Sequence, residues 1–530
     1  MGWRILQDRG TSGQLETMIT ISEDELRLAR MGYQQEFRRS FKWIHNFGFS
    51  LSHLCLLAYA PFFAMGLKLG GPSATLFAWI VVCFFNLCVS FSLAEICSAW
   101  PCSGGLYYWS AKLGGLRYGA LLSWFTAYFN LFGEIGALSS AGYGLSMTVF
   151  SCIEFYKPDF VPTQWQTTFL AIGFVLVWAV LNSFSDSFLA RLMELSLAVQ
   201  ILGPIAIMII LLAVSPTKQS AGFVFNTFEN LTGQDSMAYA IVLSLIIPSW
   251  SFIGYDSSAH ISEETVNAYK DVPKSLIYSV ALTAVLGLPF ILNATQSEPC
   301  SIILSSIVFA GIFFNGLAVN TACSRMMFAF ARDDGFGKSL SARLRWMHPQ
   351  NRTPQRAVWG GCFLAVVVLA VGFATPIGGE LGVLSIGAVG LMTAYMIPIF
   401  CKVAFMSDDF EPGEFTLGYL SAPMGWIAVV YVLFLLVLLC LPYDFPVTMD
   451  NFNFASLMAV GVLLLASLFW LLSARHWYVG PVRRVDDVNI VTMERNIVAA
   501  KDTLSEIGIL SPTPSNFGSV SSRYSRMESM

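Results

Sequence analysis

The sequence predicts an all-α integral membrane protein, and its composition, its long apolar runs and the placement of its charges support this fold class. Only 12% of the 530 residues are charged, 55% are hydrophobic, and the mean hydropathy is +0.63. A soluble globular protein carries about 25% charged residues, so this composition excludes a cytosolic enzyme. The 11 cysteines are too sparse for a disulfide-stapled secreted domain. The net charge of −4 gives no reason to expect a nucleic-acid partner.

Twelve stretches are long and apolar enough to cross a hydrocarbon core of about 30 Å. Backbone polar groups find no water in lipid, and these stretches lack the alternation of barrel strands, so each is predicted to be a helix. The twelve expected transmembrane helices are Phe47–Leu67, Ser73–Cys97, Tyr118–Cys152, Trp165–Phe184, Leu195–Val214, Met237–Gly254, Ser275–Asn293, Ser301–Phe330, Ala357–Ala374, Leu381–Cys401, Trp426–Leu441 and Phe454–Leu472.

Polar segments flank this twelve-helix domain, which we expect to span residues 46–474. Residues 1–45 form a polar N-terminal arm without the apolar core and cleavage site of a signal peptide. Residues 475–530 end in a Ser-rich run from Ser511 and contain too few apolar residues for a core, so a disordered tail is expected.

The distribution of basic residues predicts the orientation in the membrane. With a cytoplasmic N-terminus, the outside loops hold only Lys68, Lys157 and Lys218 of the 30 basic residues. The positive-inside rule therefore places both termini in the cytoplasm. The sequons at Asn230 and Asn293 then lie outside. We expect a plasma-membrane location, although helix length does not separate it from internal membranes.

Glu134 is the strongest functional candidate among the residues at membrane depth. It lies near the centre of the third expected helix, and no other charge occurs between Arg117 and Glu154. A charge at that depth costs about 2.5–3.5 kcal/mol, so this side chain must face a cavity or partner or stay protonated. Glu134 is interpreted as a proton carrier or as the counter-ion of an amine. The alternative is a neutral glutamic acid that is hydrogen-bonded to a neighbouring helix.

The sixth expected helix carries the pattern of a broken helix. Pro248 precedes Gly254 by six residues, and Asp256 follows. Proline removes a backbone donor and glycine loosens the helix, so the hydrogen-bond ladder is predicted to open between them. Broken membrane helices line cavities, where their free amides and carbonyls bind charged solutes. An ordinary kink is the alternative, and Trp250 and Phe252 are either walls of a site or plain packing.

The first expected helix contains Pro61, which can break it in the same way and would pair it with the sixth in two five-helix halves. His53 in this helix is interpreted as a hydrogen-bonded helix residue rather than a proton relay. Cys97 and Cys102, after the second helix, have no partner at metal-ligand spacing. Neither a metal site nor a cofactor is expected.

Three segments carry a resemblance to a known family: Ala94–Ala111, Trp250–Glu264 and Ser324–Gly335. They resemble the signature regions of the amino acid-polyamine-organocation (APC) transporters, especially the fungal amino acid, GABA and choline permease branch. The resemblance implies two inverted five-helix repeats, helices 1–5 and 6–10, plus two extra helices. It also implies broken helices 1 and 6, with alternating access that is usually driven by protons.

The resemblance further implies roles for individual residues. The substrate site would be formed by Tyr59, Ala60, Glu134, Trp250, Ser251, Phe252 and Gly254, with Glu134 as the proton-coupling residue. The inner gate and its loops would contain Glu95, Ser103, Gly104, Gly105, Tyr107, Asp256, Glu263 and Arg325.

The chain departs from the family pattern at three places. Relatives commonly have a glycine-containing stretch in helix one, where this chain has Ala58–Pro61. Glu134 stands where many members of the branch have glutamine, which favours a cationic or zwitterionic amine, or a shifted proton site, over a neutral solute. The connection Ala294–Cys300 between helices seven and eight is shorter than in relatives.

These observations predict a secondary active transporter that imports an amino acid, GABA, choline or a related amine by proton symport across the lipid bilayer. A nutrient sensor of the same fold is the alternative from another class. A membrane-embedded enzyme is disfavoured because neither HExxH nor GxSxG lies within or beside an expected helix. A major-facilitator carrier is the alternative within transport, but the loop after helix two lacks the basic signature of that family.

Overall fold

The computed structural model describes residues 23–214, 220–291, 298–374, 380–406, 409–448 and 452–506. The chain divides into two compact units, one of residues 36–482 and one of residues 1–35 with 483–530. Most of the connection Ala294–Cys300, the sequon at Asn293 and the Ser-rich run from Ser511 lie outside the described residues.

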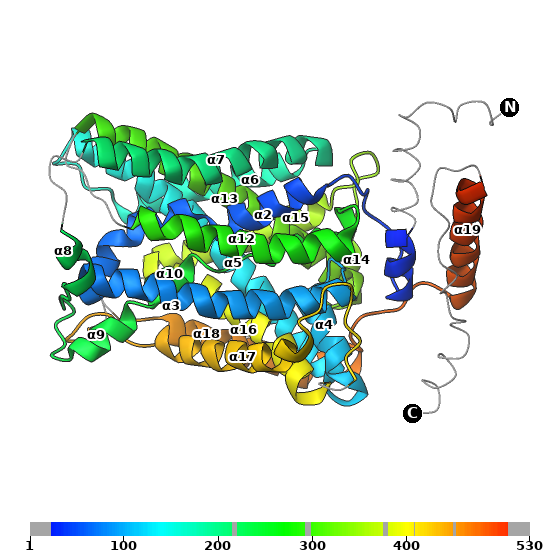
Figure 1. The fold of residues 1–530 in the computed structure, drawn as a ribbon. Coiled ribbons are helices and arrows are strands. Elements are labelled where there is room, and N and C mark those ends of the chain that lie inside the picture. Colours follow the sequence, from blue (N-terminus) through cyan, green and yellow to red (C-terminus); the bar gives the residue numbers. More distant parts are fainter. Residues whose placement is uncertain are drawn as a thin grey trace. The chain divides into compact units, whose positions relative to one another are not determined.

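The unit of residues 36–482 is helical (Figure 1), and in its described part the strand-type pairing is one isolated bridge between Phe41 and Thr265. Its helices in the first half of the chain are α2 (Trp43–Leu54), η1 (Leu56–Phe62), α3 (Phe63–Ala99), α4 (Leu106–Leu113), α5 (Gly115–Tyr156), α6 (Gln164–Asn182), α7 (Asp186–Val214), α8 (Ala221–Asn226), α9 (Met237–Leu243), α10 (Ile246–Trp250), α11 (Ser257–His260) and η2 (Ser262–Glu264). The later ones are α12 (Ala268–Phe290), α13 (Glu298–Arg332), α14 (Lys338–Leu344), α15 (Gln355–Ala374), α16 (Glu380–Phe405), η3 (Gly418–Leu420), α17 (Ser421–Leu438), α18 (Ala455–Leu472) and η4 (Ala474–His476).

The predicted all-α integral membrane fold is confirmed, and a helix lies within each of the twelve expected ranges. Eight helical stretches among the described residues are long and apolar enough to cross a bilayer, and one of them, Trp43–Ala99, contains the first two expected spans. Met237–Trp250 and Gln355–Val371 are shorter apolar helices. The chain is therefore a multi-pass membrane protein, and twelve crossings remain a prediction.

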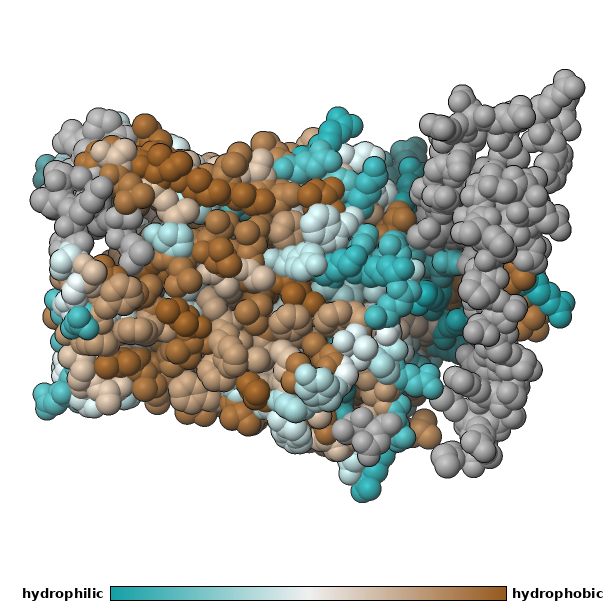
Figure 2. All heavy atoms as spheres, in the orientation of Figure 1, coloured by the Kyte–Doolittle hydropathy of each residue, from teal (hydrophilic) through white to brown (hydrophobic). Residues whose placement is uncertain are grey.

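The outer surface of this unit is suited to lipid. Figure 2 shows a broad apolar face over the helices, with hydrophilic residues gathered toward the end that carries α14. Several large apolar side chains are more than half exposed, including Phe84 at 58%, Leu202 at 63% and Phe363 at 65%. Such extensive apolar exposure would be unfavourable in water, but it costs little against acyl chains.

Helices α5 and α16 cross closely because both carry glycines at the crossing. A Cβ atom on Gly133 would lie 2.7 Å from the backbone nitrogen of Leu391, and one on Gly136 would lie 2.6 Å from that of Gly387. Small residues allow membrane helices to pack backbone against backbone. This crossing fixes the turn of α5 that carries Glu134.

The packing of the other long helices is consistent with two related repeats. Helix α3, which contains the second expected span, packs against α12, which contains the seventh. Helix α5, the third, packs against α13, the eighth. Two repeats related by a two-fold axis bring such corresponding helices together.

Helix one is broken, as the sequence predicts, but the break begins earlier than Pro61. Helix α2 ends at Leu54, and Cys55 adopts the left-handed region with φ 41°. The following η1 is a 3₁₀ segment that contains Pro61. A 3₁₀ stretch inside a membrane helix often marks a functional hinge.

Helix six is also broken, and the break begins after Trp250, between Pro248 and Gly254 as the sequence predicts. Pro248 lies within α10, residues 251–256 are irregular, and Gly254 has φ 85° before α11 begins at Ser257. Only glycine adopts this left-handed conformation readily, so Gly254 permits the reversal of the chain.

The second unit joins the two ends of the chain. Residues 23–30 are helical, and α19 (Asp487–Glu506) follows the loop at Arg484. Leu26 and Ala29 form an apolar cluster with Val485 and Ile490, against which Met493 and Ile497 also pack. The sequence predicts a disordered tail, whereas residues 487–506 of this tail form helix α19. Residues 490, 493 and 497 lie on one face of this helix and pack against apolar residues of the N-terminal arm.

Candidate functional site

A pocket lies where the two broken helices meet. Tyr59, Trp250 and Ser251 line it as the sequence predicts, together with His53 and with Asn315 of α13. Helix α5 forms part of the wall with small side chains, namely Ala137, Ser140, Ala141 and Gly144. The pocket is therefore lined by aromatic residues of the two broken helices and by small residues of α5.

Aromatic rings shape this pocket and support its wall. The rings of Phe62 and Trp250 meet edge to face with centroids 5.4 Å apart. Phe252 packs against Trp79 with ring centroids 5.1 Å apart, behind the residues that line the pocket. Ala60 lies in η1 and is half-buried. Neither Phe252 nor Ala60, both predicted to form the site, is among the residues that line the pocket.

Three polar atoms of the lining residues are buried without a hydrogen-bond partner among the described residues. They are Oη of Tyr59, Nε1 of Trp250 and Nε2 of His53. Buried polar groups in proteins are nearly always hydrogen-bonded, so unsatisfied atoms that share one pocket need an explanation. A polar ligand would satisfy them.

The two breaks are held against each other by direct contacts. Ser50 donates a hydrogen bond to the Tyr255 carbonyl at 2.7 Å, and Nδ1 of His53 lies 2.5 Å from the Ser257 hydroxyl. A Cβ atom on Gly254 would lie 1.9 Å from Cδ2 of His53. The ring of His53 therefore occupies the space that the missing side chain leaves.

Gly254→Ala is expected to destabilise the protein by more than about 2 kcal/mol, because the methyl group would enter the His53 ring and the backbone would be strained at positive φ. The measurement is the thermal unfolding of the purified protein in detergent. Gly173→Ala in α6 is the matched control, since a Cβ atom there meets nothing within 4 Å. Equal melting temperatures for the two variants would contradict the close contact.

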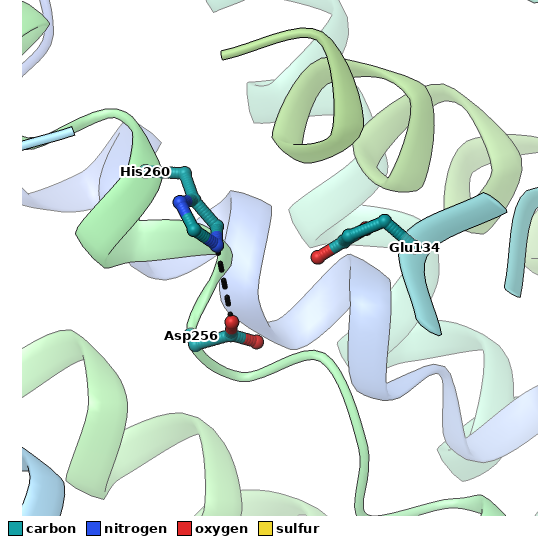
Figure 3. A group of neighbouring side chains, drawn as sticks. All are labelled: Glu134, Asp256 and His260. Carbon is teal, nitrogen blue, oxygen red and sulfur yellow. Dashed lines mark hydrogen bonds and ion pairs between the residues drawn. The ribbon is translucent and has the colours of Figure 1, made fainter. Parts of the chain in front are cut away.

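A second polar group lies beside the pocket and is formed by Glu134, Asp256 and His260, here named the Glu134 cluster (Figure 3). All three side chains are fully buried, and one ligand atom from each lies within 4.8 Å of the others. Glu134 comes from α5, one turn before Ala137 of the pocket wall, whereas Asp256 and His260 come from the broken helix six. In Figure 3 the carboxyl group of Glu134 extends toward the other two.

The two carboxyl groups of the Glu134 cluster have unequal surroundings. Tyr395 donates to Oδ1 of Asp256 at 2.5 Å, and Asn130 donates to Oδ2 at 3.3 Å. His260 Nε2 lies 3.2 Å from the same Oδ2. Neither oxygen of Glu134 has a hydrogen-bond partner among the described residues. The oxygens of Asp256 are thus surrounded by protein donors, whereas the Glu134 carboxyl group has no such donor among the described residues.

A metal ion is the alternative occupant of three such residues, because histidine and carboxylate are common ligands. However, His260 Nε2 and Asp256 are already bonded to each other, and Asp256 accepts from two further donors. The hydrogen-bonding capacity that stays unused in this cluster, among the described residues, is therefore on the Glu134 carboxyl group.

Hydrogen bonds continue from the Glu134 cluster to a buried ion pair. His260 Nδ1 lies 3.1 Å from the Ser103 carbonyl oxygen, and the Ser103 amide donates to Glu263 Oε1 at 3.0 Å. Gly105, at φ 49°, allows the loop to pass next to the His260 ring. Arg332 donates to both oxygens of Glu263 at 2.8 Å. We name Ser103, Glu263 and Arg332 the Glu263 cluster.

Burial alone would raise the pKa of Glu263, but the charge and hydrogen bonds of Arg332 and the Ser103 amide outweigh it. The pKa of Glu263 therefore lies below its ordinary value of 4.5. Glu263 is ionised near neutral pH, and the pair with Arg332 is a bidentate, charge-assisted contact of the strong kind.

The other predicted gate residues lie in separate contacts. Tyr107 packs over Gly104 and donates to Oδ2 of Asp333 at 2.8 Å. Arg325 donates to Glu264 at 2.8 and 3.2 Å rather than to Glu263. Glu95 contacts Lys402 of α16 and accepts from Ser421 of α17 at 2.7 Å. Glu95 therefore fixes the end of α3 against α16 and α17.

Comparison with known proteins agrees with this architecture. The family model described as "Amino acid permease" matches residues 41–296 and 293–464. The chain is 30% identical to "Amino-acid permease BAT1" of Arabidopsis thaliana, over 90% of this chain and 99% of that protein. It is 33% identical to the BAT1 homolog of Oryza sativa over 87% and 96%. It is 28% identical to a "Putative polyamine transporter" of Candida albicans over 90% and 92%.

The predicted membership in the APC superfamily is thus confirmed, and the fungal branch is consistent with several matches to Schizosaccharomyces pombe permeases. The matches extend over both broken helices and the segments that carry the Glu134 and Glu263 clusters. The chain belongs to the amino acid permease family, a family of membrane transporters.

Proposed function

We propose that this chain is a secondary active transporter that imports amino acids or related small amines together with protons. The observation that carries the proposal is the buried carboxyl group of Glu134, which has no hydrogen-bond partner among the described residues and lies one turn from the pocket wall. An ionisable residue inside the membrane is by default a functional residue. The names of the relatives point to amino acids and polyamines.

The pocket is the proposed substrate site. It combines aromatic walls, two buried donors on Tyr59 and Trp250, and the open backbone of two broken helices. Broken helices offer free amides to a carboxylate and free carbonyls to an ammonium group. A solute with both groups fits this combination of donors and acceptors.

Glu134 is the proposed proton carrier. In its neutral form it needs no counter-charge in the buried cluster, whereas its anion would lie beside the Asp256 carboxylate without donors of its own. Binding a proton from outside would therefore favour one arrangement of the cluster, and releasing it inside would favour another. His260 and Ser103 connect Asp256 of this cluster with the Glu263 cluster through hydrogen bonds.

The Glu263 cluster is the proposed inner gate. It ties the loop after helix six to the loop before α4 and to the end of α13. Release of the solute requires these contacts to separate as one helix bundle moves against the other. We place this gate and both chain termini in the cytoplasm from the positive-inside distribution, and we assign the protein to the plasma membrane.

Uptake of a labelled panel tests the proposal in cells that express the chain. The panel contains several amino acids, GABA, choline and a polyamine, at acid and neutral outside pH, with and without a protonophore. We expect at least one amine to accumulate, more strongly at acid pH, and accumulation to collapse with the protonophore. Surface-expressed protein that binds a panel member without accumulating it would favour the nutrient sensor instead.

A further inference from the structure

The hydrogen bonds around His53 define which of its ring nitrogens carries hydrogen. The Ser257 hydroxyl donates to the Gly254 carbonyl oxygen at 2.8 Å, and a carbonyl oxygen can only accept. The proton of Ser257 is used in that bond, so its oxygen accepts from Nδ1 of His53 at 2.5 Å. A neutral imidazole with hydrogen on Nδ1 presents a lone pair at Nε2.

The position of this acceptor is fixed by its surroundings. The ring lies against Gly254, and a Cβ atom placed on this glycine would stand 2.2 Å from Nε2. Asn315 donates to the backbone carbonyls of Ser52 at 3.0 Å and of His53 at 2.7 Å, which anchors the end of α2. Nε2 is buried, and it has no hydrogen-bond partner among the described residues. His53 therefore holds an oriented, unsatisfied acceptor in a residue that lines the pocket.

No aspartate, glutamate, lysine or arginine is among the described residues that line this pocket. Glu134, one turn away on α5, lies outside the lining set. Of the other unsatisfied lining atoms, Nε1 of Trp250 can only donate, and the Tyr59 hydroxyl can donate or accept. Among these three unsatisfied atoms, Nε2 of His53 is therefore the one that can only accept a hydrogen bond from a substrate's nitrogen.

We propose that Nε2 of His53 accepts a hydrogen bond from the substrate's ammonium group, so that the site selects amines that carry an N–H over quaternary ammonium compounds. The inference rests on the proposed function and names the specificity of the same site. A trimethylammonium group fills the same aromatic surroundings but cannot donate. When a trimethylammonium compound is bound, Nε2 stays buried without a donor. A buried acceptor without a partner costs more free energy than a made hydrogen bond contributes.

Matched pairs of ligands test this proposal on the purified full chain in lipid nanodiscs. Glycine, alanine and GABA are each compared with their N-trimethyl analogue by equilibrium binding. We expect the primary amine to bind about tenfold to a hundredfold more tightly than its analogue. In His53→Ala the two should bind within about threefold of each other, because the primary amine loses affinity and the analogue does not. An unchanged ratio in His53→Ala would overturn the proposal.

Two further variants separate this role from a structural one. Ser257→Ala keeps the ring but removes the acceptor for Nδ1, so hydrogen can move to Nε2 and the preference for the primary amine should fall. His348→Ala, in the loop after α14, changes a histidine outside the pocket and should keep the full preference. If His53→Ala does not fold, an unchanged preference in Ser257→Ala overturns the proposal.

Binding to the unaltered protein tests the proposed transporter function and the proposed role of His53 separately. Binding of none of these ligands, and of no member of the uptake panel, would contradict the proposed function itself. Binding of primary and trimethylated forms with equal affinity would leave the transporter proposal standing and overturn only the role of His53.

Discussion

Glu134→Gln is expected to abolish proton-driven accumulation while substrate exchange across the membrane continues. Glutamine imitates the neutral, protonated side chain in size and shape but cannot release a proton. The variant should therefore still bind the solute and change conformation, with the inside-to-outside ratio at equilibrium near one. In the unaltered protein each pH unit of gradient supports about a tenfold ratio for one coupled proton.

For Glu134→Gln, two quantities are measured in the same membranes over outside pH values from acid to neutral. One is the net accumulation of labelled substrate, and the other is the exchange of labelled for unlabelled substrate. Glu154→Gln, at the end of the same helix α5, is the matched control and should keep the pH-dependent accumulation. A Glu134→Gln variant with normal accumulation and normal pH dependence would show that the proton is carried elsewhere.

Arg332→Met is expected to produce the second large effect, a loss of about 3–5 kcal/mol in the free energy of unfolding. The change leaves the Glu263 carboxylate fully buried with one of its main partners removed. Truncating one member of a buried pair is costly because the other charge is then uncompensated. The double variant Glu263→Gln with Arg332→Met removes both charges and should recover part of the loss. Thermal unfolding of Arg332→Met, of Glu263→Gln alone and of the double variant in detergent measures the coupling between the two side chains.

The ion pair also predicts how the Arg332 effect depends on pH. The pKa of Glu263 lies below 4.5 in the folded protein, because Arg332 and the Ser103 amide favour its anion more than burial disfavours it. A lowered pKa contributes stability above the unfolded pKa, about 4.3 for glutamate, and loses it only as pH falls toward the folded value. In Arg332→Met the buried Glu263 carboxyl loses the main contribution that lowers its pKa, so it takes up a proton at higher pH than in the unaltered protein. The difference in unfolding free energy between the two proteins should thus be smaller at pH 5.5 than at pH 7. A difference that is larger at pH 5.5 than at pH 7 would contradict the assignment.

The fold class is predictable from sequence because membrane helices are local. A long apolar run must satisfy its own backbone, so length and hydropathy alone identify the helices. The break in helix six follows from Pro248 and Gly254 to within a turn. The break at Cys55 has no such local signal, since a cysteine at φ 41° is held there by tertiary contacts, including the Gln200 side chain 3.5 Å from its sulfur.

The candidate site is only partly predictable for the same reason. Glu134 stands out as a lone charge in an apolar run. Its neighbours Asp256 and His260 lie four residues apart, which is a helical spacing visible in the sequence, but their approach to α5 depends on the break. His53 is interpreted from sequence as an ordinary helix residue, because its contact with Gly254 and Ser257, some 200 positions later, is invisible in the chain order. The role of Glu263 as the partner of Arg332 rather than Arg325 likewise depends on the turn in η2.

Purified protein in sealed proteoliposomes with an imposed proton gradient tests the central claim most directly. The account predicts that the labelled amine identified in cells accumulates above its outside concentration only while the outside is more acidic, and that a protonophore returns it to equilibrium. Equilibration to the same level with or without the gradient would contradict proton coupling. That result would leave a facilitator that needs no proton at Glu134.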